Sequence, residues 1–336
     1  MTLGRAMIDI AGLEPTAEEK ERLSHPQVGG LILFARNFES PAQLRMLAAE
    51  VRTLREPQLL IAVDHEGGRV QRFRQGFTRI PPMRSIGACG RDDGARLARA
   101  AGLVIAAELQ AHGVDFSFAP VLDVDHGASS VIGDRAFCGD AAMLAHLAGA
   151  FVEGLTAGGM AAVGKHYPGH GYASADSHVD MPVDERSLEA IEASDLVPYR
   201  ELIGRGLAAV MPAHVVYPKV DGRPAGFSPV WLRDILRARL GFQGMIFSDD
   251  LSMEAATQGG GVVERARAAL AAGCDMVLLC NAPDAAAKLI EGLDADPVPE
   301  ARAARMRGRR LMRPADAHAG YAGAASALAR AIPEAA

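Results

Sequence analysis

Short apolar runs alternate along the chain with longer stretches in which apolar residues recur at helical spacing. Each run is rich in Val, Ile, Leu and Phe, and most are followed by a polar or glycine-rich loop and then by an Ala-, Leu-, Arg- and Glu-rich stretch. The runs predicted to be strands are 6–10, 30–34, 59–63, 116–119, 161–164, 208–211, 245–247 and 276–279. The stretches predicted to be helices are 41–54, 95–111, 141–157, 188–203, 229–240, 262–272 and 285–291. Eight strands, most of them followed by a helix, predict an α/β fold of the (β/α)8 TIM-barrel type.

The ends of the predicted helices agree with this division. Ser40-Pro41 and Ser228-Pro229 each place a capping hydroxyl before a first-turn proline. The glycines at predicted helix ends are Gly113, Gly206, Gly241 and Gly273. A Rossmann-like open sheet is the competing architecture, but it needs a glycine fingerprint directly after the first strand, and residues 11–14 supply none.

Length and composition predict a single large domain. The chain has 336 residues, of which 49% are hydrophobic, and can therefore bury a large core. We expect one catalytic barrel domain over 1–336, with the barrel at about 5–295 and a C-terminal helical extension or tail at 296–336. The Ala-rich stretch 315–336 fits either a final packed helix or a frayed tail. A cluster of arginines near the C-terminus is expected to form a solvated helix face or helix end, and the alternative is that it binds an acidic partner. The cluster consists of Arg302, Arg305, Arg307, Arg309, Arg310 and Arg313.

Charge and terminal sequence limit the partners. The formal net charge of −6 argues against nucleic acid as the main partner. No run approaches the ~18 apolar residues of a membrane helix, and Asp9 interrupts the N-terminal segment that a signal peptide would need. We therefore expect no nucleic-acid or membrane partner and a cytoplasmic location. The four cysteines are predicted to be reduced core residues, because CxxC spacing is absent. They are Cys89, Cys138, Cys274 and Cys280.

Polar residues follow five of the predicted strands. Active sites of TIM barrels lie on the loops at the C-terminal strand ends, so these residues are candidates for chemistry. They are Asp64-His65-Glu66, Asp123 with Asp125, Lys165-His166, His214 and Asp249-Asp250. Histidines, a lysine and carboxylates beside glycine-rich loops predict an active site rather than a structural surface.

Four motifs together carry a family resemblance. They are Lys165-His166-Tyr167-Pro168-Gly169-His170-Gly171, Asp176-Ser177-His178, Val131-Ile132-Gly133-Asp134-Arg135 and Ile246-Phe247-Ser248-Asp249-Asp250-Leu251-Ser252-Met253. In this order, over roughly positions 5 to 290, the chain resembles family 3 glycoside hydrolases. It is most similar to the single-domain bacterial β-N-acetylhexosaminidases of peptidoglycan recycling.

The resemblance implies the catalytic residues. Asp249 matches the family's nucleophile, a carboxylate that forms a glycosyl-enzyme ester in a retaining double displacement. Asp250 is the rival, since alternation along a strand lets only one of two neighbours face the sugar and does not choose between them. His178 is implied to be the general acid/base, oriented by Asp176, although most retaining glycosidases use a second carboxylic acid. The alternative for this pair is a polar surface loop.

The resemblance also implies residues that bind the sugar. Lys165 and His166 match ligands of sugar hydroxyls. Lys165 could instead form a buried salt bridge, to Asp123 or to Asp249.

Three further matches concern ring hydroxyls and charge. Asp64 matches a carboxylate that accepts hydrogen bonds from non-reacting hydroxyls, and Arg72 and Arg135 match the family's binding arginines. Both arginines could also hold nearby carboxylates in place. Packing or hydrogen bonding to a neighbour is the expected role of His65, His170 and His214.

The implied reaction is hydrolysis of a terminal β-1,4-linked N-acetylglucosamine from peptidoglycan fragments such as anhydro-muropeptides. The implied partner is a small carbohydrate or muropeptide, with no cofactor, no metal site and a monomeric enzyme. A β-glucosidase or β-xylosidase of the same family is the alternative. Those relatives usually carry a second domain that supplies the acid/base, and we expect none in this chain.

Three other classes of protein are possible. A metal-dependent barrel hydrolase could use Asp64, His65, His166, His170, His214 and Asp249, although the chain lacks HExxH and a His-x-His after the first strand. A Schiff-base aldolase could use Lys165, but it would leave Asp249 and the Asp176/His178 pair without a role. A sugar-binding barrel without catalysis is the third class, and Asp249 and His178 argue against it.

Overall fold

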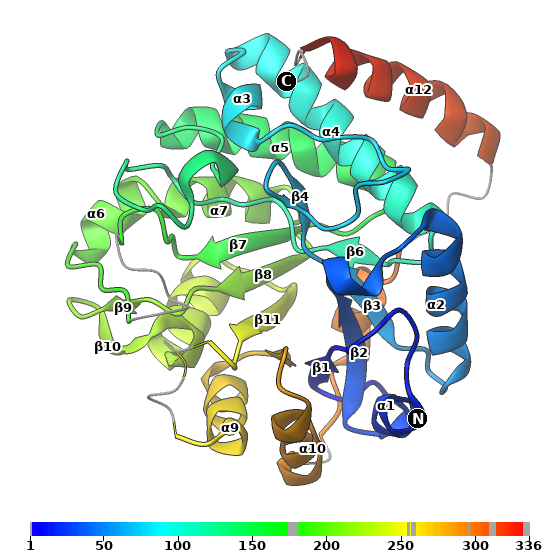
Figure 1. The fold of residues 1–336 in the computed structure, drawn as a ribbon. Helices are drawn as coiled ribbons and strands as arrows, with labels where there is room; N and C mark the ends of the chain where they lie inside the picture. Colours follow the sequence, from blue (N-terminus) through cyan, green and yellow to red (C-terminus); the bar gives the residue numbers. More distant parts are fainter. Residues whose placement is uncertain are drawn as a thin grey trace.

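Eight parallel strands form a nearly closed barrel with helices around it (Figure 1). The computed structural model describes residues 2–173, 181–253, 256, 260–294, 296–308 and 314–331. In their order around the barrel, the strands are β6 (Phe116–Ser117), β3 (Leu60–Val63), β2 (Val28–Leu33), β1 (Ala6–Ile8), β12 (Met276–Leu279), β11 (Met245–Asp250), β8 (Ala209–Pro212) and β7 (Val163–Tyr167). Each of the eight predicted runs overlaps one of these strands, so the predicted (β/α)8 barrel is confirmed.

The seam between β6 and β7 is closed by the chain that follows β6. Val121 forms a parallel bridge with Lys165, and the Leu122 N–H donates to the Lys165 carbonyl oxygen at 2.6 Å. The Val163 N–H donates to the carbonyl oxygen of Ala119 at 2.8 Å. This pairing continues the barrel where β6 is short, and it brings the residues after Leu122 beside the end of β7.

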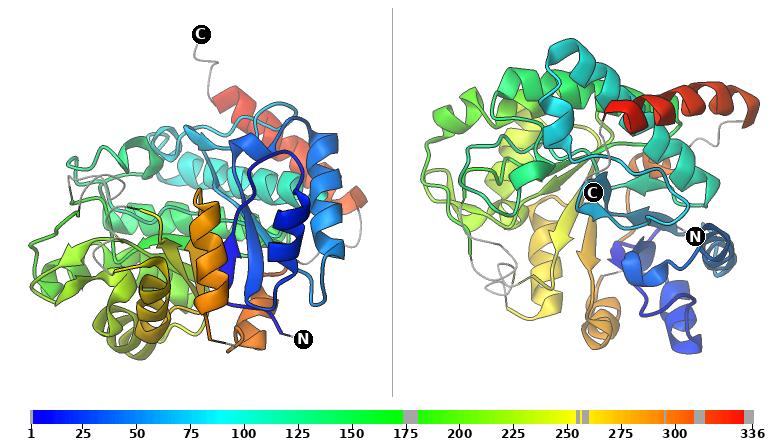
Figure 2. Two further views of the ribbon diagram at one scale, coloured as in Figure 1. Left: turned by 60° about the horizontal axis from the view of Figure 1, so that its bottom comes forward. Right: turned by 45° about the horizontal axis from the view of Figure 1, so that its top comes forward.

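Helices and two hairpins complete the fold (Figure 2). The helices are α1 (Ala17–Ser24), α2 (Pro41–Thr53), α3 (Met83–Gly87), α4 (Arg91–Ala111), α5 (Ala141–Ala157), α6 (Leu188–Ala193), α7 (Leu196–Gly204), α9 (Val262–Ala272), α10 (Pro283–Gly292), α11 (Glu300–Met306) and α12 (Pro314–Ala331). Shorter or irregular turns are η1 (Ala35–Asn37), η2 (Gly133–Arg135), η3 (Ala225–Phe227) and η4 (Val230–Arg239). The hairpins are β4 (His65–Gly67) with β5 (Val70–Gln71), and β9 (Val216–Tyr217) with β10 (Asp221–Pro224).

Several helical segments differ from the prediction, among them the short helix α3, which was not predicted. The stretch 188–203 is two helices, α6 and α7, because the chain breaks at Ser194. The stretch 229–240 forms a π-helix, η4, in place of an α-helix. Helix α1 was not predicted, although a capping box opens it: the Thr16 hydroxyl accepts from the Glu19 N–H at 3.2 Å, and the Glu19 carboxylate accepts from the Thr16 N–H at 2.8 Å.

The predicted helix ends are confirmed. The Ser40 hydroxyl accepts a hydrogen bond from the Gln43 N–H at the start of α2, and the Ser228 hydroxyl accepts one from the Trp231 N–H. Left-handed φ angles occur at the four predicted glycines, Gly113 (84°), Gly206 (90°), Gly241 (71°) and Gly273 (132°). Glycine adopts this conformation without the steric cost that a Cβ would add.

A cluster of aromatic rings fills the barrel interior below the C-terminal strand ends. Phe116, Phe118 and Phe247 have ring centroids 5.3 to 5.4 Å apart, and all three are fully buried. Burying a phenylalanine contributes roughly 1.5–3 kcal/mol. The rings therefore make a rigid floor from which the strand ends project.

The C-terminal helix packs on the barrel's outer shell. Helix α12 lies along α4 in both figures, and its Ala324 and Leu328 side chains are buried. A packed helix is therefore found over 314–331.

The arginine cluster near the C-terminus does not form the solvated face that was expected for all its members. Arg302 pairs with the buried Asp275, and Arg307 donates to the carbonyl oxygen of Gln58. Both arginines thus attach the region of α11 to the barrel. Arg309, Arg310 and Arg313 lie outside the described residues.

All four cysteines are free, but only two belong to the core as predicted. Cys274 and Cys280 are buried, whereas Cys89 is exposed and Cys138 is partly exposed. Within the part of the chain that the structure describes, no helix is both long and apolar enough to span a membrane.

Candidate active site

A cavity of about 890 Å³ opens at the C-terminal strand ends of the barrel. Its volume lies within the ~300–1,000 Å³ that is usual for small-molecule sites. Six of the predicted site residues line it: Asp64, Arg72, Arg135, Lys165, His166 and Asp249. The other two, Asp176 and His178, lie outside the described residues.

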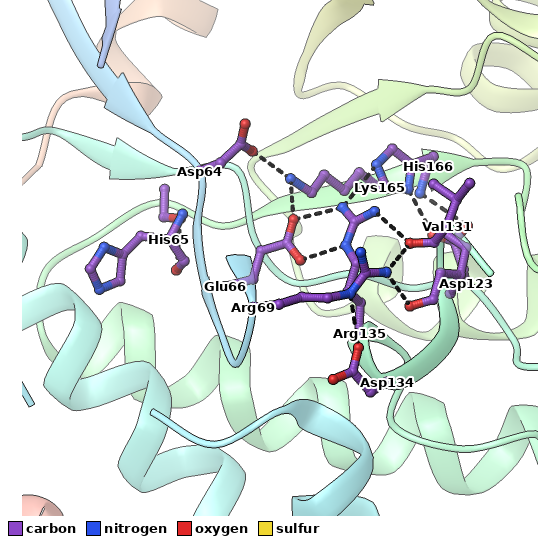
Figure 3. A network of polar contacts seen from close by, with 12 residues as sticks. Asp64, His65, Glu66, Arg69, Asp123, Val131, Asp134, Arg135, Lys165 and His166 are labelled. Carbon is purple, nitrogen blue, oxygen red and sulfur yellow. Dashed lines mark hydrogen bonds and ion pairs between the residues drawn. The ribbon is translucent and has the colours of Figure 1, made fainter. Parts of the chain in front are cut away.

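Lys165 lies at the centre of an ion-pair network (Figure 3). Its Nζ is 2.6 Å from Asp64 Oδ1 and 2.6 Å from Glu66 Oε1. Burial alone would lower the pKa of Lys165, but the two carboxylates outweigh it and the pKa is raised. The lysine is therefore a cation, paired with Asp64 and Glu66 rather than with Asp123 or Asp249.

Glu66 joins this lysine to Arg135. Arg135 Nε donates to Glu66 Oε2 at 2.9 Å and Nη2 donates to Oε1 at 2.8 Å, a bidentate pair. Burial would raise the pKa of Glu66, but the charges of Arg135 and Lys165 hold it well below its ordinary value. The sequence analysis named Glu66 among the polar residues after the third predicted strand but assigned it no role in the site. Its spacing from Asp64, two residues along an extended segment, was the available signal, because such residues share a face.

A second buried carboxylate orients His166. Asp123 Oδ2 is 2.7 Å from His166 Nδ1, and Oδ1 accepts from the N–H groups of His166 (3.2 Å) and His170 (2.7 Å). Burial would raise the pKa of Asp123, but His166 and these hydrogen bonds lower it. Because the ionised carboxylate only accepts, we infer that His166 carries its proton on Nδ1 and turns Nε2 towards Arg135, 3.5 Å away.

The two neighbouring aspartates at the end of β11 both line the cavity. Strand alternation therefore does not keep either aspartate away from the cavity, and the pairing of β11 with β12 shifts register between Phe247 and Asp250. Their bonding differs. Asp250 Oδ1 accepts from the N–H groups of Ser252 (2.9 Å) and Cys280 (3.0 Å), and Oδ2 accepts from the Ser252 hydroxyl (2.7 Å).

Asp249 has one bound oxygen, since Oδ1 accepts from the Asp250 N–H at 2.8 Å and no described residue donates to Oδ2. Burial would raise the pKa of Asp249, but His214, His166 and the Asp250 N–H outweigh it and the pKa is lowered. Burial raises the pKa of Asp250 to about 6. The two neighbouring aspartates therefore differ: Asp249 is ionised and has an oxygen free of the described residues, whereas both oxygens of Asp250 already accept hydrogen bonds.

Two of the three histidines that were expected to pack or to bond to a neighbour lie against aromatic rings. His65 lies beside Phe73 and Phe77 and points away from the ion pairs in Figure 3, and burial lowers its pKa to about 3. His214 stacks on Phe227, and its Nε2 is 3.2 Å from the Asp250 carbonyl oxygen. Both contacts fit the packing role expected from the sequence.

The metal-dependent alternative finds no geometric support among the described residues. No group of three or more His, Cys, Asp and Glu side chains there is placed to hold a metal ion. Of the proposed ligand set, His65 and His214 lie against aromatic rings, and His166 Nδ1 is directed at the buried Asp123.

The chain is fixed on both sides of residues 174–180. Gly171 lies so close to Val124 that a Cβ at this position would be 1.8 Å from the Val124 carbonyl oxygen. On the other side, Val183 forms a parallel bridge with Val216 of β9. Both approaches to the segment that carries Asp176 and His178 are therefore attached to the barrel.

Arg186 connects these two approaches. It pairs with the buried Asp184 at 2.6 Å and with the buried Asp195 at 2.7 Å, and its guanidinium lies 4.3 Å from the ring centroid of Tyr172. Burial would lower the pKa of Arg186, but both carboxylates raise it. This cluster was not predicted, because Asp184 and Asp195 are distant in the sequence from every predicted strand end.

Comparisons with known proteins agree along nearly the whole chain. The glycosyl hydrolase family 3 N-terminal domain matches residues 4–312. A beta-hexosaminidase from Methylobacillus flagellatus is 60% identical over 315 residues, which are 92% of this chain and 90% of the relative. The structure of NagZ from Neisseria gonorrhoeae in complex with N-trifluoroacetyl-D-glucosamine is similar with a TM-score of 0.90 and 47% identity, covering 98% of this chain and 99% of that chain. The same protein in complex with a zinc ion gives a TM-score of 0.89 and 46% identity, with the same coverage of 98% and 99%.

Proposed function

Because the chain belongs to glycosyl hydrolase family 3 and is a β-hexosaminidase, we propose that it is a retaining exo-β-N-acetylglucosaminidase. Its substrates are peptidoglycan fragments that end in a β-1,4-linked N-acetylglucosamine, such as anhydro-muropeptides. The complex of the Neisseria relative with an N-acylated glucosamine supports this class of sugar.

The observation that carries the proposal is the state of Asp249. Its carboxylate lies at a rigid strand end, lines the cavity, has a lowered pKa and keeps one oxygen free of the described residues. Such a group is suited to attack the anomeric carbon and form a glycosyl-aspartate, which water then hydrolyses. Asp250 is less suited, because Ser252 and Cys280 occupy its oxygens.

The proposed general acid/base is His178, with Asp176 as the carboxylate that orients it. Both assignments rest on the family motif, since the two residues lie outside the described part of the chain. A histidine with a pKa near ~6.5 can protonate the leaving oxygen and then deprotonate the attacking water. The fixed approaches at Gly171 and Val183 support a role beside the cavity.

The cations and acceptors around the cavity are proposed to hold the sugar hydroxyls. Lys165 has one N–H left after its two ion pairs, and the side chain of Asp64 is 22% exposed and can accept further hydrogen bonds. His166 and Arg135 present Nε2 and a guanidinium beside them, and Arg72 lines the same cavity. These groups form the proposed binding site for the non-reacting part of the ring.

The proposed biological role is peptidoglycan recycling in the cytoplasm, by a monomeric enzyme of one catalytic domain and without a cofactor. This role would connect the enzyme to cell-wall biogenesis and, through it, to cell shape and division. The alternative is a β-glucosidase or β-xylosidase of the same family.

The first test is the rate of aryl release from a β-N-acetylglucosaminide and from the matching β-glucoside, each with and without a chelator. We expect turnover of the first substrate alone, unaffected by the chelator. Preference for the glucoside would contradict the proposed specificity. Loss of activity with the chelator would favour the metal-dependent alternative.

A second test compares the two neighbouring aspartates as a matched pair. Asp249→Ala is expected to abolish turnover, and Asp250→Ala to reduce it less; the reverse order would overturn the choice of nucleophile. His178→Ala is expected to retain more activity on aryl substrates with good leaving groups, because these need little protonation. An equal loss on good and poor leaving groups would contradict the acid role.

A further inference from the structure

A tyrosine of the C-terminal helix reaches a buried carboxylate on α4. The Tyr321 hydroxyl donates to Glu108 Oε1 at 2.7 Å, and Glu108 is only 8% exposed. Because a hydrogen bond to a charged and largely buried acceptor is among the stronger ones, this contact fixes α12 at one defined place on α4.

The same carboxylate holds a loop on the active-site side of the barrel. Both oxygens of Glu108 accept from the Thr78 N–H at 3.0 Å, and Oε1 also accepts from the Thr78 hydroxyl at 2.6 Å. The hydroxyls of Thr78 and Tyr321 are themselves 3.3 Å apart. We call Tyr321, Glu108 and Thr78 the C-terminal latch.

The loop held by the latch begins at the cavity. Gln71 Nε2 donates to the Thr78 carbonyl oxygen at 2.9 Å, and Gln71 Oε1 accepts from the Ile80 N–H at 2.9 Å. Thr78 is therefore bonded directly to the residue before Arg72.

Arg72 depends on this loop for its position. Its side chain lines the cavity, and within the described part of the chain it makes no ion pair or hydrogen bond; its Nε is buried without a partner. No hydrogen bond or ion pair with a described residue holds the guanidinium, so its place in the cavity depends on the backbone that carries it.

We propose that Tyr321 is a positioning residue for the active site: through Glu108 and Thr78 it fixes the loop that presents Arg72 to the sugar. The inference rests on the proposed sugar-binding role of Arg72. It assigns to the C-terminal helix a part in substrate affinity, although the helix lies outside the barrel.

The test is a double-mutant cycle of Tyr321→Phe and Arg72→Ala, with KM and kcat measured on an aryl β-N-acetylglucosaminide. Phenylalanine keeps the ring and removes only the hydroxyl. Tyr321→Phe is expected to raise KM by roughly three- to tenfold with little change in kcat, and to have no further effect on KM in the Arg72→Ala background. Tyr199→Phe is the matched control, because it removes a buried hydroxyl that has no partner among the described residues.

Three different outcomes would contradict the inference, the proposed role of Arg72, or both. If Arg72→Ala raises KM but Tyr321→Phe does not, the inference is wrong and the role of Arg72 stands. Equal effects of Tyr321→Phe in both backgrounds would also overturn it. No effect of Arg72→Ala would remove both the proposed role of Arg72 and the inference.

Amide hydrogen exchange provides a readout that does not need activity. Residues 72–80 are expected to exchange faster in Tyr321→Phe than in the wild type and in Tyr199→Phe. Unchanged exchange in this loop would refute the latch whatever the enzyme hydrolyses.

Discussion

Replacing Glu66 by glutamine tests whether the ion-pair network is built around this carboxylate. Glu66 is 3% exposed and meets Lys165 at 2.6 Å and Arg135 at 2.8 and 2.9 Å. Glutamine keeps the shape and one acceptor but removes the charge. Lys165 would retain Asp64, whereas Arg135 has no other carboxylate partner within the described residues.

The substitution is expected to lower the free energy of unfolding by a large amount, although it changes only one group of the side chain. Removing one partner from a buried ion pair costs about 3–5 kcal/mol, because a buried charge is left uncompensated. Since glutamine still accepts one hydrogen bond, we expect the lower end of this range, about 3 kcal/mol, in the free energy of unfolding by urea at neutral pH. KM should rise as well, because Lys165 and Arg135 lose their shared anchor.

The effect should depend on pH with a defined sign. The pKa of Glu66 is lowered from 4.5 in the folded protein, so its stabilising contribution is complete above about pH 4.5 and is lost as the pH falls below that value. The difference in stability between the wild type and Glu66→Gln should therefore be constant near neutrality and shrink in acid. The control is Glu291→Gln, on an exposed carboxylate of α10 for which no ion pair is found in the described chain. The reasoning is refuted if Glu66→Gln unfolds and binds substrate as the control does.

Three further predictions follow from individual contacts. Asp123→Asn should lower kcat/KM by roughly 10- to 100-fold, since a charge-assisted hydrogen bond of ~1.5–3 kcal/mol orients His166, while Asp134→Asn at an exposed pair should change little; equal effects in steady-state assays would contradict this. Gly171→Ala should lose activity and thermal stability because its Cβ would be 1.8 Å from a carbonyl oxygen, whereas Gly222→Ala, with open space around it, should match the wild type. The pKa of Asp250 is raised from 3.8 to about 6, so its contribution to stability is lost as the pH rises through that range; Asp250→Asn should gain stability relative to the wild type over the same interval, and parallel pH profiles of unfolding would argue against it.

The strands could be predicted from the sequence because each is a short, almost wholly apolar run. In a parallel barrel both faces of a strand are buried, so a run such as that of β3 contrasts sharply with the polar loop after it. The residues that end these runs reach one face of the barrel for the same reason, which is why Asp64, Lys165 and Asp249 could be identified together.

What the sequence did not reveal depends on contacts between distant segments. The bulge that lets both Asp249 and Asp250 reach the cavity arises from pairing with β12, and nothing in the local pattern encodes it. The salt-bridge partners expected for Lys165 were Asp123 or Asp249, whereas Asp64 and Glu66 are the observed partners, because the pairing depends on how two separate strand ends meet across the barrel. Helix α1 was missed although its capping box, Thr16 to Glu19, was present in the sequence.

The two approaches to residues 174–180 have a consequence for engineering. Gly171 and Val183 are held by the barrel, and Arg186 links the two sides through its contacts with Tyr172 and Asp184. The stretch from 173 to 181 can therefore be treated as an exchangeable cassette whose points of attachment do not change. Swapping this stretch between relatives would transfer the residues at positions 176 and 178 without redesigning the scaffold. The proposed proton-transfer residues could then be varied while the residues of the proposed sugar site stay the same.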